Sequence, residues 1–237
     1  MSGTVIDMHM HTVLGAYDSS LKPDDLGAEA KRVGLTGVNI TEHDRVWDAY
    51  TLARFREAQA PLFVNNGIEV STDMGHIIAV GLKEYVPGIR RLAELRRVID
   101  DIGGFLVVAH PFRHFYDPVH FMRQGRKPLE MVPELLAKLP VFEYVDAIEA
   151  LNGANTPREN VVALQVAKLL AKPATGGSDC HSTQGIGYYC TIFEDRLETP
   201  EQLLAALHAG RFQPGHDLPA GNLTPFTETS LGDRGSA

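Results

Sequence analysis

The chain is poor in cysteine and has neither a long apolar run nor a basic leader. Cys180 and Cys190 are the only cysteines among 237 residues, too few for a disulfide framework in a chain that can bury its own core, so we expect reduced thiols. The opening MSGTVIDMHMH lacks the basic start and apolar run of a secretory signal. No segment approaches the roughly 18–20 apolar residues of a membrane span. We therefore expect a cytoplasmic protein without a membrane partner.

Positive charge is also scarce. The formal net charge is -8. This charge argues against binding of duplex DNA over a broad surface, because such binding depends on many Lys and Arg contacts to phosphate. Long nucleic acid is therefore not expected as a partner, and any phosphate recognition must be local.

Apolar segments of strand length alternate with helical ones, which predicts an α/β protein. The expected strands lie in residues 4–11, 37–44, 62–70, 76–82, 105–111, 145–153, 173–181 and 187–193. The expected helices span about 23–34, 49–60, 88–102, 129–138, 157–171 and 200–210, and TPRE (156–159) and TPEQ (199–202) have the pattern of capping boxes. We expect a single domain over 1–216 and a flexible tail, rich in Gly, Pro, Ser and Thr, over 217–237.

Side chains that can bind metals recur at the ends of these strands. They are His9, His11, His43, Glu69, His76, His110, Asp179 and His181. Residues two apart on a strand share a face, so His9 can point with His11, and Asp179 with His181 if that segment is extended. In parallel α/β folds the carboxyl ends of the strands converge at one rim. One such histidine alone is more often structural, but the joint pattern predicts a metal site.

The ordered motifs DMHMHT, TEHD, GIE followed by GH, AHP and GSDCH, between residues 7 and 181, resemble those of the polymerase and histidinol phosphatase (PHP) superfamily. GYYCTIF and the following helix resemble the family's C-terminal closure. The resemblance implies a distorted (β/α)7 barrel with two or three divalent metal ions at the C-terminal rim of the strands. It also implies hydrolysis of phosphate esters, with Glu69 and Asp179 as catalytic residues.

The resemblance further implies three sets of ligands. The first metal would be held by His9, His11, Glu69 and Asp179, the second by Glu69, His76 and His110, and the third by His43, His181 and Asp18. Asp18 departs from the family pattern, in which the ligand lies five or six residues after the His-x-His motif. A short loop insertion would reconcile the spacing, and the alternative is a turn residue. Asp7 and Asp44 could each orient an imidazole or be plain surface or capping residues.

Imidazole and carboxylate ligands suit zinc, manganese or iron rather than Mg²⁺ or Ca²⁺. Three such ions against the carboxylates of Asp18, Glu69 and Asp179 leave a local charge of about +3, or about +2 with bound hydroxide, which matches a phosphomonoester dianion. The expected reaction is attack of a metal-bound hydroxide on phosphorus.

Four residues near the motifs are candidates for contact with substrate. Arg45 and Arg113 could each bind phosphate oxygens through a planar guanidinium, or form surface ion pairs. His114 could protonate the leaving group, or be an ordinary loop histidine. Asn152 could reach the rim, or form an Asn-Gly turn.

Three function classes remain open at this point. The preferred one is a metal-dependent phosphatase acting on a small phosphorylated metabolite or nucleotide. An exonuclease or phosphodiesterase acting on short oligonucleotides is the alternative, disfavoured because no basic groove or run of stacking aromatics is evident. A non-catalytic metal-binding scaffold is the third, and eroded ligand motifs would be expected for it.

Overall fold

The computed structural model describes residues 3–115 and 132–231, and its alternating strands and helices confirm the predicted α/β class. The strands are β1 (Val5–Met10), β2 (Gly37–Ile40), β3 (Phe63–Asn66), β4 (Ile68–Thr72), β5 (Gly75–Val80), β6 (Phe105–Val108), β7 (Ala147–Asn152), β8 (Ala174–Gly177), β9 (Tyr189–Phe193), β10 (Phe212–His216) and β11 (Thr224–Pro225). The helices are α1 (Pro23–Val33), α2 (Ala49–Gln59), α3 (Leu92–Ile102), α5 (Pro133–Leu136), α6 (Pro157–Leu169) and α7 (Pro200–His208), with short 3-10 helices η1 (Pro140–Glu143), η2 (Leu218–Ala220) and η3 (Glu228–Leu231). Part of the helix predicted near 129–138 lies outside the described residues.

The strands form two sheets, in the orders β11-β10-β9-β1-β2-β3 and β4-β5-β6-β7-β8. The pairs β1–β2, β2–β3, β6–β7 and β7–β8 are parallel, whereas β5 runs antiparallel to both β4 and β6. Isolated parallel bridges, Met10 with Cys180 and His43 with Glu69, join the two sheets at both seams. Strand pairing among the described residues therefore gives two bridged sheets rather than one continuous ring.

The single strand predicted over residues 62–70 is divided at Gly67, and this prediction was wrong. β3 pairs with β2, whereas β4 pairs with β5 in the other sheet. The backbone of Gly67 donates to the carbonyl of Ile40, and a Cβ at this position would lie 2.8 Å from the amide oxygen of Asn39. Glycine therefore permits the close approach at which the chain changes sheets.

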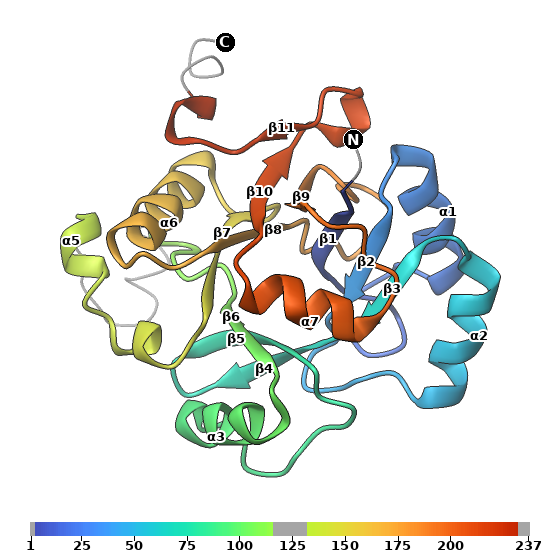
Figure 1. Cartoon of the computed structure of the whole chain (residues 1–237), viewed down its shortest axis with the longest axis horizontal. Helices are drawn as coiled ribbons and strands as arrows, with labels where there is room; N and C mark the ends of the chain where they lie inside the picture. The colour runs from blue at the N-terminus through green and yellow to red at the C-terminus, as the bar shows by residue number, and fades with distance from the viewer. Residues whose placement is uncertain (1–2, 116–131, 232–237) are drawn as a thin grey trace.

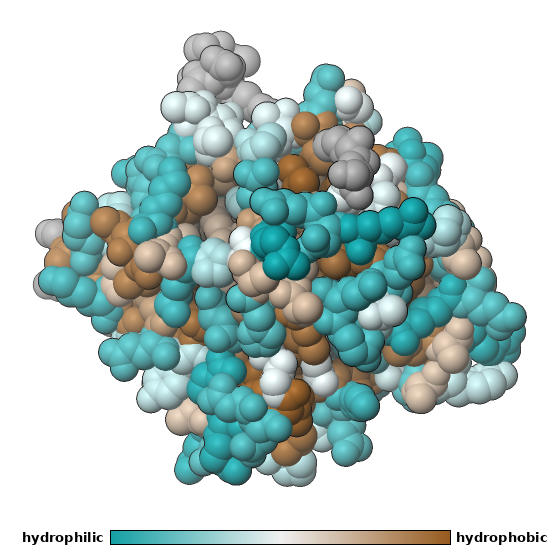
Figure 2. All heavy atoms as spheres, viewed as in Figure 1, coloured by the Kyte–Doolittle hydropathy of each residue, from teal (hydrophilic) through white to brown (hydrophobic). Residues whose placement is uncertain are grey.

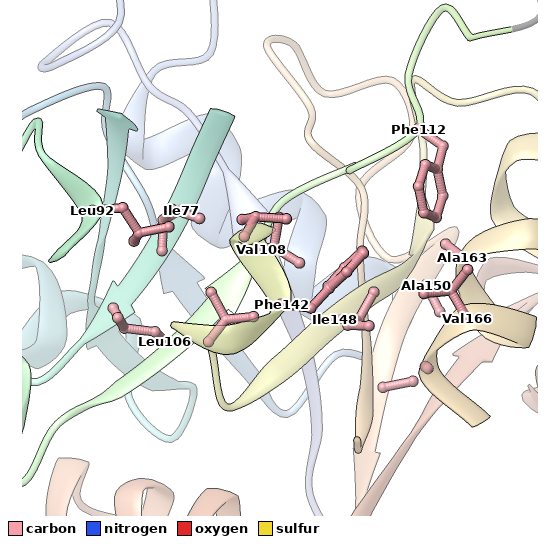
Figure 3. Close-up of a cluster of buried hydrophobic side chains, with 14 of the residues drawn as sticks. Ile77, Leu92, Leu106, Val108, Phe112, Phe142, Ile148, Ala150, Ala163 and Val166 are labelled. Atoms are coloured by element: carbon pink, nitrogen blue, oxygen red, sulfur yellow. The ribbon is translucent and has the colours of Figure 1, made fainter. Parts of the chain in front are cut away.

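Alternate residues of the second sheet pack into different parts of the core. Ile77 and Ala79 of β5 lie in a cluster with the buried face of α3, and part of this cluster is shown in Figure 3. Ile78 and Val80 lie in another cluster, with Leu203 and other apolar residues of α7. Both faces of the strand are thus covered, as its continuous apolar sequence requires.

The helices lie around the strands, with α1, α2, α3 and α6 at the periphery and α7 across the near side in Figure 1. Figure 2 shows mainly hydrophilic side chains on this face, with hydrophobic ones between them. The capping boxes predicted at Thr156 and Thr199 are confirmed at the starts of α6 and α7. No helix within the described ranges is long and apolar enough to cross a membrane.

Part of the segment predicted as a tail packs against the rest of the chain. β11 pairs with β10, and Phe226 is buried in the cluster that contains α3 and α6. Lys168 of α6 also forms an ion pair with Glu228 at 2.6 Å. Residues 217–231 are therefore anchored where they are described, and the division at residue 216 stays a prediction.

Candidate metal centre

The side chains singled out as metal ligands meet at one end of the strands. A cavity of about 370 Å³ opens there. It is lined by Tyr17, Asp18, His43, Asp44, Glu69, Ser71, His76, His110, Arg113, Asp179 and His181. His9 and His11 are fully buried and do not line it. Since β5 is antiparallel to its neighbours, its first residues, and not its last, reach this end.

Glu69 lies at the middle of the cluster because of strand alternation. Its neighbours Ile68 and Val70 pack into the apolar core on one face of β4, so Glu69 points to the other. Its Oε1 atom is 2.9 Å from Nδ1 of His76 and 3.0 Å from Nε2 of His110. Its Oε2 atom is 2.9 Å from Nδ1 of His43. The two oxygens thus face different histidines, as a bridging carboxylate requires.

Asp179 faces the histidines of β1. Its Oδ1 atom is 3.5 Å from Nε2 of His9 and 3.2 Å from Nε2 of His11. Asp179 and His181 would share a face only on an extended segment, and this condition is not met, because β8 ends at Gly177 and Asp179 has a φ of +53°. The turn separates the two side chains, and Nδ1 of His181 is 3.9 Å from Oδ1 of Asp179.

Asp18 lies beside the histidines predicted to share its metal. Its Oδ1 atom is 3.7 Å from Nε2 of His43 and 3.5 Å from Nε2 of His181. The loop that carries it is fixed, since the backbone of Ser20 donates to the carbonyl of His181 at 2.8 Å. The unusual spacing after His11 therefore still brings this carboxylate to the cluster.

Protonation in the cluster is set by burial and neighbouring charge. Burial raises the pKa of Glu69, but the charge of His9 and hydrogen bonds from His110 and other histidines outweigh it, and the pKa lies well below its usual value. Burial lowers the pKa of His11 to about 4. An ionised carboxylate and a neutral imidazole are the forms that bind metal ions.

The donor set fits divalent transition metals. Ligand atoms within 4.8 Å of one another occur in four groups among the described residues: His9, His11 and Glu69; His9, His110 and Asp179; Glu69, His76 and His110; and His11, His43 and His181. Nε2 of His9 and Nε2 of His11 lie only 3.0 Å apart and face the same carboxylates. Nitrogen and oxygen donors in this mixture suit zinc, manganese or iron.

Of the four residues predicted to contact substrate, only Arg113 lines the cavity. Arg113 lines the cavity and is held by Asp179 and by Oδ1 of Asn152, the latter at 2.8 Å. Asn152 is fully buried and contacts Arg113 rather than the cavity. Arg45 and His114 are exposed and are not among the residues that line the cavity. Their contact with substrate stays a prediction.

For Asp7 and Asp44, the described contacts favour the alternative to orienting an imidazole, whereas another carboxylate contacts one. Asp7 accepts backbone N–H groups of Ser178 and Gly187, and Asp44 accepts from Ser71. Nδ1 of His9 instead donates to Glu149 at 2.9 Å. Glu149 was not predicted, because its only signal in the sequence is a charged residue within the apolar strand sequence AIEAL.

Comparisons with known proteins agree with this arrangement. A family model described as PHP-associated matches residues 157–212. The matched segment includes Asp179 and His181, which line the cavity. Over this segment the chain is similar to PHP-associated proteins. A search of curated proteins found no match.

Solved structures share the fold of this chain. The crystal structure of PsfC from Pseudomonas syringae matches with a TM-score of 0.58 and 20% identity, covering 86% of this chain and 89% of PsfC. A two-domain protein from Bacteroides vulgatus that contains a predicted PHP-like metal-dependent phosphoesterase matches with a TM-score of 0.57 and 22% identity, over 90% of this chain and 64% of that one. An amidohydrolase from Chromobacterium violaceum with bound sulfate and no metal matches with a TM-score of 0.57 and 18% identity, over 85% and 96%. At these identities the likeness establishes the fold.

Proposed function

We propose that this protein is a metal-dependent hydrolase that acts on phosphomonoesters of small molecules. The observation that carries the proposal is the position of Glu69, whose two oxygens face His76 and His110 on one side and His43 on the other. A carboxylate placed in this way can bridge two metal ions, and paired metal ions are a recurrent device of phosphoryl transfer. The match to a PHP-associated family model over residues 157–212 and the likeness to the Bacteroides vulgatus structure support the same class.

Three groups of side chains would hold the metal ions. They are His9, His11, Glu69 and Asp179; Glu69, His76 and His110; and His43, His181 and Asp18. When bound, the ions would acidify a water molecule so that it can attack phosphorus at neutral pH, and would offset the charge of the phosphate. Glu69 and Asp179 would keep the donors of β1 and β5 in place.

Arg113 supports the choice of a phosphate ester. Its guanidinium lines the cavity and is fixed by Asp179 and Asn152, so it presents a fixed positive group to a ligand. A planar guanidinium suits the several free oxygens of a terminal phosphate. The cavity of about 370 Å³ is near the lower end of the range for ligand sites and favours a small ester over a polymer.

We also propose that the two sheets act as one distorted (β/α)7 barrel. The support is the pair of bridges, Met10 with Cys180 and His43 with Glu69, which link the sheets at both seams next to the cluster. Such closure would hold ligands from both sheets at fixed distances.

The proposal is tested by loading purified protein with Mn²⁺, Zn²⁺ or Fe²⁺ and comparing p-nitrophenyl phosphate with bis-p-nitrophenyl phosphate. Both esters have the same leaving group, so kcat/KM reports charge and shape at phosphorus. We expect the monoester to be preferred, and activity on oligonucleotides to fall as they lengthen. Preference for the diester, or faster turnover of longer oligonucleotides, would support the nuclease instead. Metal binding without hydrolysis of either ester would support a scaffold.

A further inference from the structure

Glu149 is a fully buried carboxylate on β7. Its neighbours Ile148 and Ala150 pack into the apolar core with Ala163 of α6, so Glu149 points to the opposite face of the strand. A buried charge of this kind is stable only where it is well paired or hydrogen-bonded. The hydrogen-bond partners of Glu149 therefore show which residues it fixes in place.

The two oxygens of Glu149 contact β1, the residues after β6 and the end of its own strand. Oε1 accepts from Nδ1 of His9 on β1 at 2.9 Å. Oε2 accepts from the backbone N–H of His110, directly after β6, at 2.9 Å, and from Nδ2 of Asn152 at 2.9 Å. One carboxylate thus joins the side chain of one proposed ligand to the backbone of another. His110 has a φ of +32°, so its backbone conformation depends on such support.

In the neutral form of His9, which a metal ion requires, the hydrogen bond determines which nitrogen is free. An ionised carboxylate only accepts, so Nδ1 of His9 must carry the proton. Nε2 then points toward Glu69 and Asp179, at 3.5 Å from each. We propose that Glu149 is a positioning residue that keeps Nε2 of His9 directed at the metal cluster and ties His9 to His110. This inference rests on the metal centre of the proposed function.

An amide at this position cannot replace the carboxylate. If the oxygen of a glutamine faces Nδ1 of His9, its NH₂ group faces the N–H of His110 and the amide of Asn152, and donors oppose donors. If its NH₂ group faces His9 instead, Nδ1 must accept and the proton moves to Nε2, which removes the lone pair needed for a metal ion. Both orientations disturb the cluster although the size of the side chain hardly changes.

The first test measures zinc affinity of the full-length protein by competition with a chromophoric chelator. We expect Glu149→Gln to bind at least one zinc ion about 10- to 100-fold more weakly than wild type, the usual effect of losing a residue that orients a metal-binding imidazole. Glu159→Gln is the matched control, because Glu159 is also buried but contacts the start of α6, where glutamine suits a capping box equally well. Equal affinity of Glu149→Gln and wild type would overturn the inference.

The second test needs no variant and so applies even if Glu149→Gln does not fold. Ring ¹⁵N spectra of the zinc-loaded wild type should show the proton of His9 on Nδ1, with Nε2 bearing no proton. A proton on Nε2 of His9 would overturn the inference.

The two proposals fail in different ways. If wild type binds zinc and both tests give the expected result but no ester is hydrolysed, the proposed function is wrong and the role of Glu149 stands. If phosphomonoesters are hydrolysed but the zinc affinity of Glu149→Gln is unchanged, the proposed function stands and the role of Glu149 is wrong. Wild type that binds no zinc, manganese or iron would overturn both.

Discussion

Nδ1 of His76 lies 2.9 Å from Oε1 of Glu69, and this contact follows from the register of β4 and β5. The antiparallel pair places Ser71 opposite His76 and Ile78 opposite Glu69, so His76 and Glu69 are diagonal neighbours on one face. His76, near the start of β5, can therefore contact Glu69 of β4. The antiparallel direction of β5 is what completes the second group of ligands.

Replacing Glu69 by Gln should weaken metal binding by both groups of proposed ligands that share it. Activity should fall by more than about 100-fold, beyond the loss typical for residues that only orient a ligand. Elemental analysis of the purified variant should show less metal than wild type, while Glu159→Gln should retain it. Normal turnover with a normal metal content would contradict a bridging role.

Purified protein should carry about two to three transition-metal ions per chain when chelators are avoided. Because metal ions would bind the folded chain through groups from several strands, removing them with EDTA should lower the Tm by on the order of 10 °C. Differential scanning calorimetry before and after restoring Zn²⁺ checks this. Absence of metal together with an unchanged Tm would contradict the site.

Arg113→Ala should reduce kcat/KM for p-nitrophenyl phosphate more than for bis-p-nitrophenyl phosphate, because a terminal phosphate offers more oxygens to the guanidinium. Arg113→Lys should recover only part of the loss, since lysine keeps the charge but not the planar fork. Arg32→Ala, on the exposed surface of α1, is the control. Equal losses for the two esters would instead indicate that Arg113 acts only through its contact with Asp179.

Both thiols should be unreactive in the folded protein. Cys180 and Cys190 are buried, and burial, with the nearby charge of Asp7, raises the pKa of each thiol far above its usual value. At pH 8 each is therefore protonated and poorly nucleophilic. Ellman's reagent should release no thiolate from the native protein and react with both cysteines in guanidinium chloride. Rapid reaction of the native protein would show that the packing around them opens.

Thr199→Ala should destabilise the chain by about 1 kcal/mol, because it removes the side chain that caps α7. Leu203 and Leu207 of this helix are buried against the strands, so loss of the cap affects the core as well. Urea denaturation of wild type and variant measures the difference. Thr199→Ser, which can form the same cap, should behave like wild type.

The sequence by itself determined most of the elements and the candidate metal donors. Thr156 and Thr199 mark helix starts because a capping box is a local pattern, complete within four residues. His9, His11 and His110 could be predicted to converge because the ends of parallel strands meet at one edge. These inferences need only local periodicity and one general rule of strand arrangement.

The tertiary structure decided how those donors face one another. Which strand pairs with which is set by contacts between distant residues, so the break at Gly67 and the antiparallel β5 could not be read from local patterns. The turn at Asp179 likewise depends on its contact with β1, where its backbone donates to the carbonyl of His9 at 2.7 Å. In the sequence, Glu149 is recognisable only as a charged residue within an apolar strand, and its partner His9 lies 140 residues away. Long-range packing alone brings that carboxylate to His9.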